Sequence, residues 1–165
     1  MSNLDILKSK ILPLAEIRHT VARLRFKGKK IVFTNGCFDI LHLGHVDYLA
    51  KAADEGDVLF VGINTDESTT RLKGPSRPIN DEIQRSILIA SLHFVDHVVL
   101  FGEDTPLDLI KSIEPDVLVK GADYQIEKIV GADFVISLGG TVKTIEFLPG
   151  YSTTAIVNKI KMGQS

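Results

Sequence analysis

The sequence predicts an α/β domain with a five-stranded parallel sheet and helices on both faces, preceded by a helical extension. From residue 31 onward, short apolar runs alternate with amphipathic segments. The runs are rich in β-branched and aromatic residues, as is typical of strands that are covered on both faces. In addition, 165 residues suit one domain, and no internal repeat or low-complexity linker divides the chain.

The first 28 residues are interpreted as the N-terminal helical extension, and residues 29–165 as the main domain. An apolar stripe at helical spacing lies on each side of Pro13, and Gly28 ends the second stripe. The stripe residues are Leu4, Leu7 and Ile11 before the proline, and Leu14, Ile17, Val21 and Leu24 after it.

Strands are expected at the four apolar runs and at a fifth, mixed stretch that suits a sheet edge. These segments are 31–33, 58–61, 98–101, 117–119 and 141–147. Helical patterns separate them, at 45–55, 66–72, 81–93, 105–113 and 126–138. Strands that alternate with helices in this way favour right-handed crossovers, and therefore a Rossmann-like sheet.

Helix starts are marked by capping residues. Asn80 is expected to cap the helix over 81–93, and Thr105 followed by Pro106 is a second helix start. Ser152 is expected to cap a short final helix. In a parallel sheet ligands bind beyond the carboxyl ends of the strands. This rule points to the loops 35–45, 64–80 and 120–125 and to the approach to Ser152.

The loop after the first strand carries the strongest chemical signal. It runs from Thr34 to His45 and joins a buried strand to a helix that is expected to begin near Gly44. Backbone N–H groups at a helix start favour a bound phosphate, and Gly36 and Gly44 allow the main chain to approach it. His42 and His45 can direct two imidazoles at one anion. Such donors stabilise the charge that accumulates on phosphorus-bound oxygens during nucleophilic attack.

The two histidines could also have a purely structural role or bind a metal. As half of a zinc site they would need His93 and His97, but those two residues straddle a helix–strand junction, so no metal site is predicted. A P-loop and a Gly-x-Gly-x-x-Gly fingerprint are both absent from the sequence, which excludes two common kinds of phosphate site.

Composition sets the expected surroundings of the protein. A net charge of −2 gives no reason to expect nucleic acid as the main partner. No apolar run approaches the ~18 residues of a membrane span, and the single cysteine, Cys37, excludes an intramolecular disulfide. We therefore expect a cytoplasmic protein with no membrane partner.

Several motifs occur in a fixed order. They are Gly36-Cys37-Phe38-Asp39, His42-Leu43-Gly44-His45, Asn64-Thr65-Asp66, Arg71 to Asn80, Glu82 to Arg85, Val95 to Val99, Val119 to Tyr124 and Gly150 to Thr154. Together they resemble the cytidylyltransferase-like nucleotidyltransferases, which carry a His-x-Gly-His motif, over roughly residues 29–160. The motifs are most similar to those of the adenylyltransferase domain that acts on D-glycero-β-D-manno-heptose 1-phosphate. In many bacteria that domain is fused to a sugar kinase.

This resemblance implies transfer of AMP from ATP to a sugar 1-phosphate, with Mg²⁺ bound to the ATP. The products would be pyrophosphate and an ADP-sugar that is used to make lipopolysaccharide. It implies a catalytic set of His42, His45 and Lys73. The implied nucleotide-binding set is Asn35, Gly36, Cys37, Phe38, Gly44, Lys120, Gly121, Asp123, Tyr124, Ser152, Thr153 and Thr154. The implied substrate-binding set is Asp39, Asn64, Arg77 and Arg85. A homodimer and a separate sugar kinase chain are possible partners.

Alternatives remain for individual residues and for the activity. Arg85 could be a surface helix charge paired with Asp81, Lys73 a solvated loop charge, and Cys37 a packed thiol. Glycerol-phosphate cytidylyltransferases have an arginine where this chain has Phe147, which disfavours that activity. A cytidylyltransferase for glycerol 3-phosphate or an amino-alcohol phosphate, and a non-catalytic nucleotide-binding module, are the competing functions.

Overall fold

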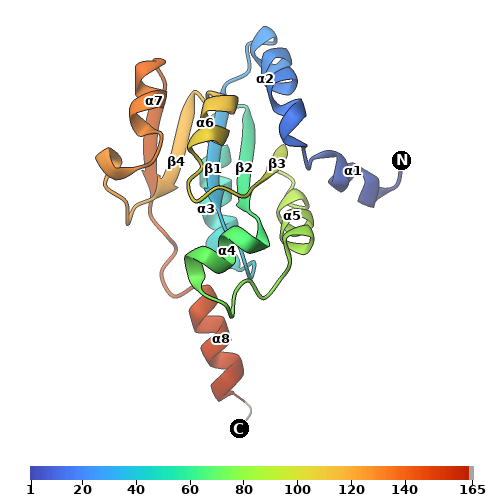
Figure 1. Ribbon diagram of the computed structural model, residues 1–165, viewed down its shortest axis with the longest axis vertical. Helices are drawn as coiled ribbons and strands as arrows, with labels where there is room; N and C mark the ends of the chain where they lie inside the picture. The colour runs from blue at the N-terminus through green and yellow to red at the C-terminus, as the bar shows by residue number, and fades with distance from the viewer. Residues whose placement is uncertain (164–165) are drawn as a thin grey trace.

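The computed structural model describes residues 1–163 and contains one five-stranded parallel sheet in the order β3-β2-β1-β4-β5 (Figure 1). The strands are β1 (Ile31–Gly36), β2 (Val58–Asn64), β3 (His97–Phe101), β4 (Val117–Gly121) and β5 (Thr141–Ile145). All five predicted strands are confirmed. The strand order reverses between β1 and β4, and in such sheets a ligand crevice forms at this reversal.

Helices cover both faces of the sheet, as predicted. The helices are α1 (Asn3–Ser9), η1 (Leu14–Glu16), α2 (Ile17–Phe26), α3 (Leu43–Ala53), α4 (Asp66–Lys73), α5 (Glu82–Ala90), α6 (Leu107–Ile113), η2 (Ile126–Lys128), α7 (Ala132–Ser137) and α8 (Thr153–Met162). One core cluster joins α2, α6 and α7 to one face, and a second joins α3 and α5 to the other. Helix α8 extends away from the body and has no buried residue (Figure 1).

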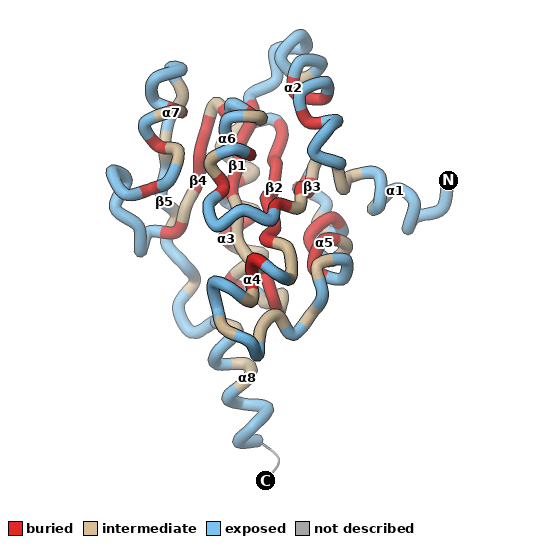
Figure 2. The backbone as a smooth tube through the Cα atoms, in the orientation of Figure 1, coloured by how far each residue is buried: buried red, intermediate tan, exposed pale blue. Residues whose placement is uncertain are grey.

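The burial of each strand follows its place in the sheet. Every residue of β2 is buried, because neighbouring strands and helices on both faces cover it (Figure 2). Strand β5 is largely exposed, as expected for the edge, and ends at Ile145, two residues before the predicted end at 147. Among residues 1–163, no helix is both long and apolar enough to cross a membrane.

The N-terminal segment is packed against the sheet. Ile11 forms a parallel bridge with Val98, and the Leu12 N–H donates to the Val98 carbonyl at 2.8 Å. Ile17 and Val21 of α2 are buried in the same core as the strands. Residues 10–12 thus cover the exposed edge of β3, and α2 contributes to the stability of the whole domain.

Four predictions for the helices are wrong. Helix α6 begins at Leu107 with Pro106 as its N-cap, and not at Thr105. Asp81, not Asn80, caps α5 by accepting from the Gln84 N–H at 2.8 Å, because the Asn80 amide donates to the Asp39 carbonyl instead. The same helix ends at Ala90 and does not reach residue 93. The helix expected over 126–138 is divided into η2 and α7, because Gly131 at φ 85° interrupts it. The Ser152 cap of α8 is confirmed.

Candidate active site

A cavity of about 570 Å³ lies at the carboxyl edge of the sheet, where the strand order reverses. It is bounded by the loop after β1, the loop after β4 and the start of α8. Its lining residues are Asn35, Gly36, Cys37, Phe38, Asp39, His45, Tyr48, Lys73, Arg77, Lys120, Gly121, Asp123, Tyr124, Phe147, Thr153 and Thr154. Most of the residues proposed from sequence therefore converge on one cavity.

The two histidines mark the start of α3. His42 is the N-cap, and its Nδ1 accepts from the His45 N–H at 3.4 Å. The two rings are stacked, with centroids 3.8 Å apart, and only His45 is among the residues that line the cavity. A Cβ added to Gly44 would lie 3.1 Å from the His42 ring and from the Tyr151 Cβ. The glycine therefore permits the close contact between the helix start and the Tyr151 segment.

His45 is held in its neutral form. Burial, followed by the neighbouring His42 and Lys73, lowers the pKa of His45 to about 4. Its Nδ1 is buried without a hydrogen-bond partner among residues 1–163. Near pH 7 the side chain therefore acts as a hydrogen-bonding group and not as a fixed positive charge.

The lowered pKa of His45 predicts a pH dependence of stability. Because the folded pKa lies below the usual 6.5, the unfolded chain binds a proton more readily between about pH 6.5 and about pH 4. The neutral His45 side chain therefore makes its full contribution to the free energy of unfolding above about pH 6.5. This contribution declines as the pH falls, by at most ~1.4 kcal/mol per pH unit. Urea unfolding at pH 5, 6 and 7 gives the free energy of unfolding at each pH, and this free energy should fall less between pH 7 and pH 5 for His45→Ala than for the unchanged protein. An equal fall in both proteins would contradict the buried, neutral state of His45.

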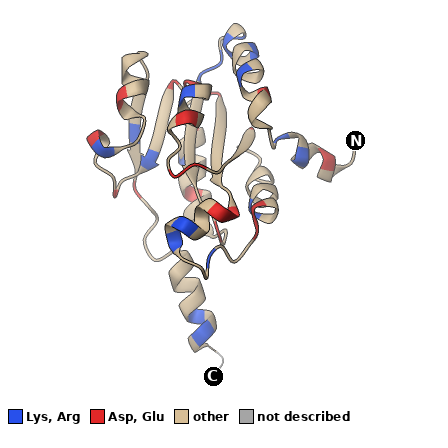
Figure 3. Ribbon diagram, viewed as in Figure 1, with Lys and Arg blue, Asp and Glu red and all other residues tan. Residues whose placement is uncertain are grey.

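Two lysines line the cavity from different elements. Lys73 ends α4, and Lys120 lies in β4, where its ammonium group donates to the Asn35 Oδ1. Burial lowers the pKa of Lys120 to about 8, although Asp123 opposes this shift. The last turn of α4, with Arg71 and Lys73, is basic (Figure 3), and Lys73 lines the same cavity as Thr153 and Thr154 at the start of α8. Both lysines can thus neutralise phosphate groups within the cavity.

The start of α8 closes the other side of the cavity. Ser152 caps this helix by accepting from the Ala155 N–H at 3.0 Å, while Thr153 and Thr154 line the cavity. Phe147 reaches over Gly121, since a Cβ added to that glycine would lie 2.2 Å from the phenylalanine ring. The cavity therefore combines the amide ends of α3 and α8, which favour bound anions, with an aromatic wall.

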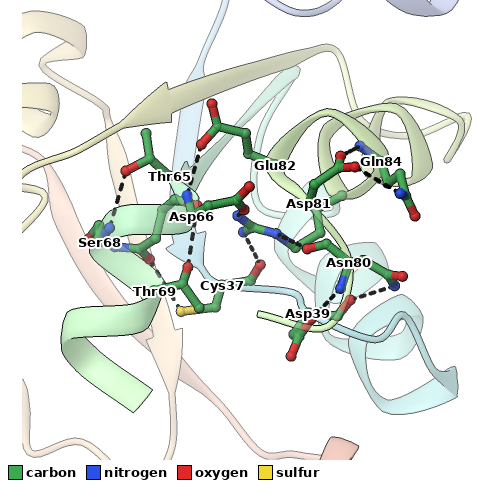
Figure 4. Close-up of polar contacts among 12 residues, drawn as sticks. Cys37, Asp39, Thr65, Asp66, Ser68, Thr69, Asn80, Asp81, Glu82 and Gln84 are labelled. Carbon is green, nitrogen blue, oxygen red and sulfur yellow. Dashed lines mark hydrogen bonds and ion pairs between the residues drawn. The ribbon is translucent and has the colours of Figure 1, made fainter. Parts of the chain in front are cut away.

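Asp39 and Arg77 connect two loops at the rim of the cavity. The buried Asp39 carboxylate accepts from the Ile79 N–H at 2.7 Å and from Arg77 at 2.7 Å. It also accepts from the Asn80 N–H at 3.0 Å (Figure 4). Burial alone would raise the pKa of Asp39, but these hydrogen bonds outweigh it and lower the pKa. The Asp39 carboxylate thus fixes the loop of residues 77–80, and Arg77 remains at the cavity wall.

Arg85 is not at the surface, and it does not line the cavity. Its side chain is completely buried and donates to Asp66 at 2.7 Å, to the Cys37 carbonyl at 2.7 Å and to the Asn80 carbonyl at 3.0 Å. The alternative of a surface charge paired with Asp81 is therefore wrong, and the burial of Arg85 does not favour the substrate contact that the motif resemblance implies. A sequence signal was available, because Arg85 is four residues before Ile89 on the buried face of α5.

Two residues of the cavity are not predicted from the sequence. Tyr48 lines the cavity and shares a 2.8 Å hydrogen bond with Thr34, and burial raises the pKa of Tyr48 to about 12. Its spacing of three residues from His45 on one helix was the available signal. The second such residue is Phe147, which stands where glycerol-phosphate cytidylyltransferases have an arginine and was not expected to line the cavity. Asn64, by contrast, lies in an adjoining cavity.

The sequence matches a known protein family over most of its length. The family model described as cytidylyltransferase-like matches residues 33–159, which include the histidine pair, both lysines and the threonines at the start of α8. The chain belongs to the cytidylyltransferase-like family.

Curated relatives are identical to the chain at more than half of the aligned positions. It is 53% identical over 152 residues to the bifunctional protein HldE of Citrifermentans bemidjiense, covering 92% of this chain and 31% of that protein. It is 58% identical over 133 residues to the protein of the same name from Campylobacter curvus, covering 81% and 28%. The chain thus spans about a third of the length of these relatives.

Solved structures agree with the fold. A lipopolysaccharide core biosynthesis protein of Thermoplasma volcanium is 35% identical, with a TM-score of 0.58, and the match covers 73% of this chain and 98% of that one. A pantoate–β-alanine ligase of Francisella tularensis is 18% identical, with a TM-score of 0.61 over 94% of this chain and 79% of the ligase, and shows the fold alone.

Proposed function

We propose that this domain transfers AMP from ATP to D-glycero-D-manno-heptose 1-phosphate, producing an ADP-heptose and pyrophosphate. The reaction type follows from membership of the cytidylyltransferase-like family. The resemblance of the motifs to those of heptose 1-phosphate adenylyltransferases supports the choice of sugar and base. The name of the Thermoplasma volcanium protein, a lipopolysaccharide core biosynthesis protein, agrees with that choice.

The observation that carries the proposal is the convergence of His45, Lys73, Lys120 and Thr153 on one cavity. An oxygen of the sugar phosphate attacks the α-phosphorus of ATP, and the bond to the bridging oxygen breaks as pyrophosphate leaves with the electron pair. The attacking oxygen is already ionised near pH 7, so no strong general base is needed. The side chains and helix-start amides position the phosphates and stabilise charge in the transition state.

Magnesium is proposed to enter with ATP. Among residues 1–163, no three His, Cys, Asp or Glu side chains are grouped as a metal site, whereas Thr153 and Thr154 line the cavity. The residues present therefore fit an ion whose ligands are mostly phosphate oxygens and water, which is how Mg²⁺ commonly binds with nucleotides. Bound there, Mg²⁺ would neutralise part of the triphosphate charge.

The partners proposed are ATP and the sugar phosphate, within the cytoplasm. The relatives named as bifunctional are about three times as long as the segment they share with this chain. We propose a sugar kinase as the source of the sugar 1-phosphate, as a separate chain, and a homodimer as the assembly.

The test of the proposed function is a pyrophosphate-release assay that combines ATP, CTP or GTP with heptose 1-phosphate or glycerol 3-phosphate. Release is expected only with ATP and heptose 1-phosphate. Activity restricted to CTP and glycerol 3-phosphate would replace the proposal with a cytidylyltransferase. Tight ATP binding without turnover on either phosphate would instead indicate a non-catalytic nucleotide-binding module.

A further inference from the structure

A second cavity, of about 480 Å³, adjoins the one described above. It lies among the end of β2, the end of α4, the start of α6 and the segment around η2. The residues that line both cavities are Asn35, Gly36, Cys37, Lys73, Lys120 and Tyr124. The two cavities therefore meet along a boundary that contains both lysines.

A reaction between two phosphorylated substrates requires two sites that meet at the reacting phosphorus. The first cavity holds His45 and the threonines at the start of α8, which suit the triphosphate. Its other cation, Arg77, is paired with the Asp39 carboxylate at 2.7 Å. Lys73 and Lys120 lie on the boundary, so a phosphate that enters through the second cavity can contact both lysines beside the triphosphate.

The part of the second cavity that is not shared suits a sugar. Its polar lining residues are Asn64, Asp104, Thr105 and Lys128, which carry an amide, a carboxylate, a hydroxyl and an ammonium group. These groups can donate to and accept from several hydroxyls. Apolar side chains complete the wall and can pack against the C–H faces of a sugar ring; they are Leu72, Pro106, Ile129 and Val130.

Contacts within the protein hold two of these polar side chains, those of Asp104 and Asn64, in place. Asp104 pairs with the Arg71 Nε at 3.0 Å, and Arg71 also donates to the Gly102 carbonyl. The buried Asn64 donates to the Ser68 hydroxyl at 3.0 Å. The Ser68 hydroxyl in turn donates to the Glu103 carbonyl at 3.2 Å. Side chains fixed in this way lose less freedom when a ligand binds.

We propose that this second cavity is the acceptor site, with Asp104, Thr105 and Lys128 contacting the hydroxyls of a glycosyl phosphate whose phosphate lies between Lys73 and Lys120. The proposal rests on the proposed function and adds the residues that select the sugar. It assigns sugar recognition to the segments after β3 and β4, and not to Arg77 or Arg85.

Asp104→Ala and Lys128→Ala test this assignment against Asp108→Ala and Lys111→Ala, which change exposed residues of α6 outside both cavities. In the full chain, the first pair should raise KM for heptose 1-phosphate by about tenfold or more, with KM for ATP within about twofold. Calorimetry should show the same weakening for heptose 1-phosphate alone. The control pair should leave both KM values unchanged.

Two results would overturn the assignment. One is an unchanged KM and unchanged binding of heptose 1-phosphate in Asp104→Ala and Lys128→Ala. The other is an equal rise in KM for ATP, which would make the second cavity part of the nucleotide site. If the unchanged protein releases no pyrophosphate with any pair of substrates, the proposed function fails, and the binding measurement still decides whether the cavity holds a sugar phosphate.

Discussion

Replacing Arg85 with alanine is expected to lower the free energy of unfolding by about 3–5 kcal/mol, because a large, completely buried side chain and its hydrogen bonds are removed. The guanidinium is completely buried and donates to Asp66, Cys37 and Asn80. Its removal would leave a carboxylate and two carbonyls without their donor, together with a cavity beside α5. Urea unfolding followed by circular dichroism measures the loss.

Two further variants separate the possible roles of Arg85. Arg85→Lys retains the charge but cannot reach three separate acceptors, so an intermediate loss of stability is expected. Arg18→Ala removes an exposed arginine of α2 and should change stability by no more than about 0.5 kcal/mol. If Arg85→Ala unfolds normally but loses turnover, Arg85 would be a substrate-binding residue as the motif resemblance implies.

Arg85 also shows why the sheet was predictable while some side chains were not. A strand covered on both faces is uniformly apolar, so β1 and β2 are visible in the sequence. A buried arginine has no such local pattern, because its burial depends on acceptors from the distant segments around Cys37 and Asp66 as well as on nearby Asn80. Its polar character favours an exposed position in any prediction based on composition.

Capping at α5 illustrates competition that sequence alone does not resolve. Asn80 and Asp81 are both good capping residues. Asp81 caps the helix only because Asp39, about forty residues earlier, forms hydrogen bonds with the Asn80 side chain and main chain.

The order of the motifs placed His45, Lys73 and Thr153 at one edge of the sheet, since the carboxyl ends of parallel strands share an edge. The division of that edge into two cavities depends on tertiary packing.

His45→Ala is expected to lower kcat by about a hundredfold to a thousandfold, the usual effect of removing one positioned donor to a reacting phosphate or carbonyl oxygen. The ring lines the cavity at the amide end of α3, where it is neutral in the free protein. A bound triphosphate would meet a hydrogen-bond donor there. Pyrophosphate release at saturating ATP and sugar phosphate measures kcat.

The stability of this variant should change little in comparison. His45 stacks on His42 at 3.8 Å and contacts the edge of Phe38 at 5.2 Å, while its buried Nδ1 has no partner among residues 1–163. Loss of ring packing is therefore partly offset by removal of an unsatisfied polar atom, and a loss of about 1–2 kcal/mol is expected.

His45→Gln and His19→Ala complete the experiment. Glutamine retains a side-chain N–H near the same position, so it should recover part of the lost rate, whereas His19 is exposed on α2 and its loss should leave kcat unchanged. A large effect on kcat with little effect on stability assigns His45 to the transition state. Near-normal turnover by His45→Ala would remove His45 from the catalytic set and leave Lys73, Lys120 and the amides at the two helix starts to stabilise the reacting phosphate.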